Sequence, residues 1–87
     1  MSIVLSPRLD TAAAAPLRLS LQKLVDAAEP VAIDAAGVDQ IGQACLQVLA
    51  AGRAAAVARG LPWQVSFPSV AMVEAGELAA IDVLTAA

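Results

Sequence analysis

The chain has 87 residues, of which 60% are hydrophobic, and a formal net charge of −3. A chain of this length forms one domain, which we expect to span residues 1–87. Its five basic residues are scattered and offer no track for nucleic-acid phosphates, while one cysteine without any histidine leaves no zinc set. We therefore expect no nucleic-acid partner, no structural metal and no cofactor.

Charged residues and prolines interrupt every apolar stretch before it reaches the roughly 20 residues that a membrane-spanning helix needs. The N-terminus also lacks a basic region followed by an apolar core and a small-residue cleavage site. We therefore expect no direct membrane insertion and a cytoplasmic location.

In the first half of the chain, the pattern predicts a strand, a helix and a second strand. Ile3–Leu5 is a short apolar run that ends at a Ser-Pro pair. A helix is predicted near residues 15–28, because Pro16 favours a first turn over a helix interior, which leaves residues 11–15 as a separate turn. Its inward stripe contains Leu17, Leu21, Leu24, Val25 and Ala28. Val31–Ile33 is too short for a helix and suits a buried central strand.

In the second half, a helix is predicted over residues 43–59, ending before Gly60, with Leu46, Leu49 and Val57 facing inward. Residues 63–67 alternate apolar and polar side chains, as a half-buried strand does. A third helix is predicted over residues 69–79, capped by Ser69, with Met72, Val73, Ala75 and Leu78 inward. Ile81, Val83 and Leu84 suit a terminal turn or a short last strand.

Strands that alternate with helices predict an α/β fold with one small, mainly parallel sheet of about four strands and three to four helices. Four segments, in the right order, resemble the STAS family of sulfate-transporter and anti-sigma-factor-antagonist domains. They are Arg8-Leu9-Asp10 followed by Ala-Pro-Leu-Arg, the segment Val31–Leu49, Phe67-Pro-Ser-Val-Ala71, and Leu78–Leu84. The resemblance implies a STAS-like fold. One short strand precedes Arg8, where many members of the family have two.

The resemblance also implies a regulatory loop just before the second helix. The family's Asp-Ser-Ser-Gly, which carries a phosphorylatable hydroxyl, corresponds here to Gly42-Gln43-Ala44-Cys45. Gln43 and Ala44 cannot accept phosphate, so these two positions form a degenerate phosphosite. Gln43 then acts as a fixed contact, or the loop has no remaining role.

A partner-binding surface is predicted around this loop. The resemblance places Arg8 and Asp10 beside it. A stripe of Gln43, Gln47, Ala50, Ala51 and Ala54 continues along the second helix, where it either admits a partner closely or is simply an alanine-rich exposed face. The predicted contact residues are Arg8, Asp10, Gly42, Gln43, Ala44, Gln47 and Ala51.

No catalytic residue is predicted, because the chain lacks histidine and tyrosine and has one cysteine. Cys45 near a helix start is a candidate activated thiol, but a small buried residue is the stronger expectation. Asp10, Asp34 and Asp39 form a candidate carboxylate cluster for a cation or a general base. For Asp34 and Asp39, capping or bonds to loop amides is the stronger expectation.

The resulting hypothesis is a non-catalytic regulatory module that binds a protein partner. The resemblance implies an anti-sigma factor antagonist or a chemotaxis-operon protein in signal transduction, with a histidine-kinase-type or anti-sigma ATPase as partner. Two alternatives remain: the STAS subunit of a lipid-transport ATPase, and a module that binds a small ligand or a nucleotide. The chain is expected to be a monomer or a weak homodimer.

Overall fold

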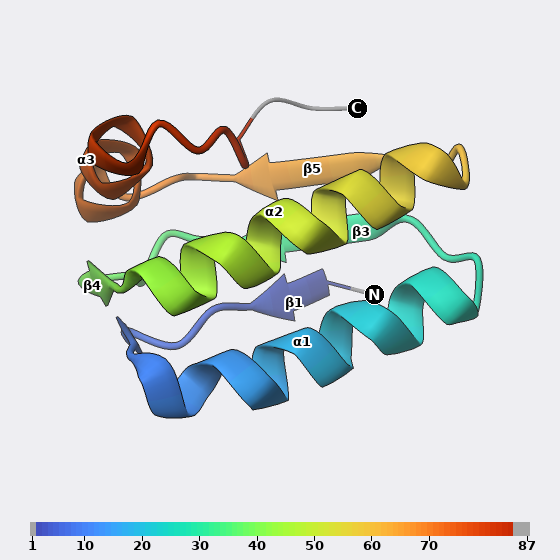
Figure 1. Cartoon of the computed structure of the whole chain (residues 1–87), viewed down its shortest axis with the longest axis horizontal. Coiled ribbons are helices and arrows are strands. Elements are labelled where there is room, and N and C mark those ends of the chain that lie inside the picture. Colours follow the sequence, from blue (N-terminus) through green and yellow to red (C-terminus); the bar gives the residue numbers. More distant parts are fainter. Residues whose placement is uncertain (1, 85–87) are drawn as a thin grey trace.

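The computed structural model describes residues 2–84, which form an α/β fold (Figure 1). In chain order the elements are β1 (Ser2–Val4), β2 (Arg8–Leu9), α1 (Thr11–Asp26), β3 (Val31–Asp34), β4 (Gln40–Ile41), α2 (Gln43–Ala58), β5 (Trp63–Ser66) and α3 (Val70–Ala79). The predicted α/β class and the predicted strand at β3 are confirmed, and α2 and α3 match their predicted ranges to within one residue at each end.

The strand pairings within residues 2–84 are all parallel, in agreement with the predicted mainly parallel sheet. The main sheet has three strands in the order β1-β3-β5, so β3 is central, and β2 and β4 form a separate two-stranded ladder. In the main sheet Ile3 lies opposite Ile33, which lies opposite Val65. The short β2–β4 ladder lies at the end of the sheet toward which β3 runs, beside the start of α2 (Figure 1).

Helices α1 and α2 lie side by side over one face of the main sheet (Figure 1). Val31 and Ile33 of β3 are buried beneath them, whereas Val4 on the alternate face is 74% exposed. The two helices approach closely at Gly52, where a Cβ atom would come within 2.8 Å of the Leu21 Cδ1 atom. A larger residue at this position would require the end of the Leu21 side chain to shift within the core.

The segment after α3 packs against β5 through Trp63. The indole Nε1 atom donates a hydrogen bond to the Val83 carbonyl oxygen at 2.9 Å, and both residues are buried. Residues 81–84 form no strand, so of the two predicted alternatives the non-strand one is correct. This contact satisfies the only polar atom of a large buried side chain.

The start of α1 differs from the prediction. Asp10 is the N-cap, its carboxylate accepts a hydrogen bond from the Ala13 amide at 3.1 Å, and Pro16 lies inside the helix. The prediction of a separate turn over residues 11–15 is therefore wrong. Pro16 removes one intrahelical hydrogen bond, but the cap and the burial of Leu17 just beyond it hold the chain helical.

Three residues predicted to face inward are exposed. Val57 is 48% exposed and Leu78 is 90% exposed, while Ala28 lies beyond the end of α1 with φ of 55°. In α2 the buried stripe passes through Ala56, and in α3 it centres on Met72. Val57 and Leu78 are each rotated away from these stripes, because successive helical residues turn by about 100°.

Candidate protein-binding site

The loop before α2 is held by the β2–β4 ladder. Arg8 pairs with Gln40 and Leu9 with Ile41, and the Gly42 amide then donates to the Leu9 carbonyl oxygen at 2.9 Å. Gly42 is the N-cap of α2, and no side-chain hydrogen bond caps this helix. The ladder therefore joins the loop to the residues that start α1.

The first turns of α1 and α2 lie at the same end of the molecule as a result (Figure 1). Asp10 caps α1 directly after β2, while Gln43 and Ala44 open α2 directly after Gly42. Gln43 is exposed and Ala44 is half-buried. The structure thus places Asp10 beside the start of α2, where Gln43 and Ala44 lie, a proximity that the sequence suggested only through the family resemblance.

Cys45 lies beneath the first turn of α2 and contacts the cap of α1. Its side chain is fully buried, and the Sγ atom donates a hydrogen bond to the Asp10 carbonyl oxygen at 3.3 Å. Burial raises the pKa of the Cys45 thiol, and the negative charge of Asp10 raises this pKa further. The expectation of a buried residue is confirmed, and the alternative of an activated thiol is contradicted.

The other predicted contact residues spread along the surface from this loop. Arg8 is exposed on β2, and Gln47 is exposed one turn into α2. Ala51 lies a further turn along, at a separate hollow of about 400 Å³ between α1 and α2 that Arg18 and Asp26 also line. The predicted residues therefore form a strip rather than one compact cluster.

A groove of about 560 Å³ opens between this loop and α3, and we call it the loop groove. Its lining comes from β2, the start of α1, β4 and α3, and α3 packs against β4. The lining residues are Leu9, Asp10, Thr11, Asp39, Gln40, Ile41, Gly42, Ala71, Glu74, Ala75 and Leu78. Only Asp10 and Gly42 of these were predicted as contact residues.

The loop groove is acidic. Asp10, Asp39 and Glu74 contribute three carboxylates, and its lining residues include no lysine or arginine. Sequence reasoning missed Glu74 because α3 was interpreted only through its inward-facing stripe. An acidic groove attracts cations and repels phosphate groups.

The candidate carboxylate cluster of Asp10, Asp34 and Asp39 is not formed. Within residues 2–84, no group of three or more histidine, cysteine, aspartate or glutamate side chains is placed to hold a metal ion. Asp34 instead accepts a hydrogen bond from the Ala36 amide at 3.0 Å, which confirms the expected bond to a loop amide. Asp39 lines the loop groove, and its backbone amide donates to the Pro7 carbonyl oxygen at 2.8 Å.

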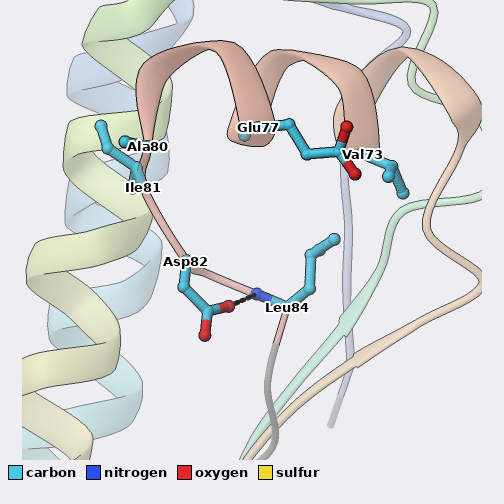
Figure 2. Close-up of a pocket in the computed structure, with 7 residues that line it drawn as sticks. Val73, Glu77, Ala80, Ile81, Asp82 and Leu84 are labelled. Atoms are coloured by element: carbon cyan, nitrogen blue, oxygen red, sulfur yellow. Dashed lines mark hydrogen bonds between the residues drawn. The ribbon is translucent and has the colours of Figure 1, made fainter.

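A third hollow, of about 300 Å³, lies between α3 and the segment that follows it (Figure 2). Val73 and Glu77 line it from α3, and the Leu84 amide donates to the Asp82 carboxylate at 3.1 Å. Glu74 and Leu78 line the loop groove instead, so the two hollows lie on opposite flanks of α3. This hollow includes none of the predicted contact residues.

The longest helices in the described part of the chain have 16 residues, and none is both long and apolar enough to cross a bilayer.

A family model described as "Mlab, STAS domain" matches residues 1–86. Comparisons with curated proteins and with solved structures gave no match. The match covers nearly the whole chain, and it agrees with the parallel sheet, the helix order and the position of the loop before α2. This chain belongs to the STAS domain family.

Proposed function

We propose that this STAS domain is a non-catalytic regulatory module that binds a protein partner through the loop before α2. The supporting observation is the hydrogen bond between Gly42 and Leu9, because it fixes that loop against the segment carrying Asp10. The proposed contact surface consists of Arg8, Asp10, Gly42, Gln43, Ala44, Gln47 and Ala51.

The proposed interaction is constitutive. Gln43 and Ala44 occupy the first two positions of α2, where an anion is favoured, but neither residue has a hydroxyl that could receive phosphate. Binding therefore depends on the amount of the module or of its partner, and phosphorylation of this loop does not control it.

The proposed partner is an ATP-using regulatory protein. STAS relatives pair with kinase-type anti-sigma factors, with histidine kinases of chemotaxis-type operons, and with the ATPases of lipid transporters. We place the complex in the cytoplasm, and we take the free protein to be a monomer or weak homodimer.

Nucleotide or small-ligand binding is the competing function. The loop groove is the larger of the two described hollows that include predicted contact residues, and its three carboxylates repel the phosphates of a nucleotide. Titration with ATP and GTP, followed by amide chemical shifts, separates the two functions. A saturable response to either nucleotide in the absence of a protein partner favours the competing function.

The decisive experiment uses affinity capture from the native cytoplasm, followed by affinity measurements with the recovered protein. Ala44→Gln adds bulk without charge at a half-buried position of the proposed surface. A lost contact and an unsatisfied polar group at an interface cost about 1–3 kcal/mol. We therefore expect the affinity to fall about tenfold or more, which corresponds to about 1.4 kcal/mol.

Ala15→Gln is the matched control, because Ala15 is an exposed alanine inside α1 and lies outside the proposed surface. It should bind as the parent does, and thermal melts should show that both variants fold. Equal affinity for Ala44→Gln and the parent, together with no effect of Gln47→Ala, would show that this surface is not the docking site.

A further inference from the structure

Two large apolar side chains are exposed on the face of α3 that borders the loop groove, one on either side of Glu74. Val70, Glu74 and Leu78 follow one another at four-residue spacing and therefore share a face of the helix. Val70 is 73% exposed and Leu78 is 90% exposed. An exposed valine and leucine beside a groove form an apolar ridge that suits contact with another protein.

Part of the groove lining is also apolar. Leu9 and Ile41 come from the β2–β4 ladder, and Ala71 and Ala75 come from α3. The alanines are small, so large side chains of a partner can enter between the ladder and the helix. Such a groove matches the way in which an amphipathic segment inserts its apolar side chains.

The charges around the groove indicate which sign of charge a bound segment of the partner should carry. Asp39 lies on the ladder side and Glu74 on the helix side, while Asp10 lies at the start of α1. These carboxylates attract a lysine or arginine from both the ladder side and the α3 side of the groove, and they repel an acidic segment.

We infer that the loop groove binds a cationic amphipathic segment of the partner protein, with large apolar side chains against α3 and basic side chains between Asp39 and Glu74. This inference rests on the proposed protein-binding function and adds the chemistry of the partner's docking segment. The same charges disfavour nucleic acids and anionic lipid surfaces, because both present phosphates.

The test uses a short synthetic peptide with leucine and lysine at helical spacing. Isotope-labelled protein is titrated with this peptide, with a version carrying glutamate in place of lysine, and with a version carrying serine in place of leucine. We expect saturable shifts at the amides of residues 39–42 and 70–78 with the first peptide only. The affinity should fall as ionic strength rises, because exposed charge pairs are screened.

Two variants assign the effect to the groove charges. Asp39→Asn combined with Glu74→Gln removes two carboxylates from the rim, whereas Asp10 is left unchanged because it caps α1. We expect the leucine-lysine peptide to bind about fivefold to tenfold more weakly, since two exposed ion pairs with the peptide are lost and each contributes modestly. The matched control, Asp26→Asn with Glu29→Gln, removes two exposed carboxylates at the far end of α1 and should not change affinity.

The inference is overturned if the glutamate peptide binds as tightly as the lysine peptide, if the shifts lie elsewhere, or if the groove variant and the control behave alike. Failure of this inference is distinct from failure of the proposed function. If Ala44→Gln weakens binding of the native partner and the groove variant does not, the proposed function is supported and the inference is overturned.

Discussion

The thiol of Cys45 donates a hydrogen bond to the carbonyl oxygen of Asp10, with the sulfur and oxygen atoms 3.3 Å apart. This contact joins the first turn of α2 to the cap of α1 across 35 positions of sequence. It lies directly beneath the proposed docking surface. The geometry of that surface is therefore tied to the packing of Cys45 against the backbone of Asp10.

Cys45 should react slowly with thiol reagents in the folded protein. The thiolate is the reactive form, and burial together with the charge of Asp10 raises the pKa of this thiol above its ordinary value. Labelling at neutral pH should accelerate strongly when guanidinium is added. Rapid stoichiometric labelling of the folded protein would contradict the buried contact, and Cys45→Ala serves as the blank.

The raised pKa of Cys45 also determines the direction in which pH changes the stability of the fold. Because the folded state holds the thiol proton more tightly than the unfolded chain does, the contribution of Cys45 is complete below the unfolded-state pKa of this thiol. It is lost as pH rises toward the folded-state pKa. Denaturant melts across alkaline pH should show this decline in the parent and a smaller decline in Cys45→Ala.

Asp10→Ala should destabilise the protein through loss of the α1 cap. The hydrogen bond from the Ala13 amide to the Asp10 carboxylate is removed, at a typical cost of about 1 kcal/mol. For a domain of this size the melting temperature should fall by about 4–8 °C. Asp39→Ala, which removes an exposed carboxylate without a capping bond, provides the comparison.

Asp10→Asn separates the cap from the charge. Asparagine still caps a helix, so the melting temperature should stay close to that of the parent. The pKa of Cys45 should fall relative to the parent, because the repelling charge has gone, while burial still holds it above the ordinary value. An unchanged labelling rate across alkaline pH would argue against the influence of Asp10.

The ends of α1 and α2 offer a reciprocal pair of stability variants. Both helices end in the same hydrogen-bond pattern, in which a residue with positive φ follows the cap: Ala28 at 55° after α1 and Gly60 at 68° after α2. Ala28→Gly should stabilise the protein by up to about 1 kcal/mol, and Gly60→Ala should destabilise it by about the same amount. Thermal melts of the two single variants and the double variant test this, and the double variant should lie near the parent.

Local signals in the sequence were sufficient to predict the central strand and the last two helices. Ser69 caps α3 as predicted, with its hydroxyl accepting from the Met72 amide at 3.2 Å. The prediction for α1 was wrong because it started the helix near Pro16. In the structure the Asp10 cap and core packing keep the chain helical through this proline. Local preference is a weaker constraint than burial of an amphipathic face.

The candidate site was less predictable, because it depends on contacts between distant segments. β2 and β4 have two residues each, which is too short for any periodic pattern, yet their pairing positions the loop. Leu78 was predicted to face inward as a large apolar residue of an amphipathic helix, although it is exposed at the loop groove. Only the placement of α3 beside β4 brings Glu74 and Asp39 to the same groove.

The all-parallel pairing has a consequence for how this chain folds. Ser2 lies opposite Ala32, Arg8 opposite Gln40 and Val31 opposite Trp63, so partner residues in every described ladder are about 30 positions apart. No hairpin is available to start the sheet, and each ladder forms only after a loop containing a whole helix has closed. We therefore expect long-range strand pairing to limit the folding rate, and folding to be slower than in a helical bundle of the same length.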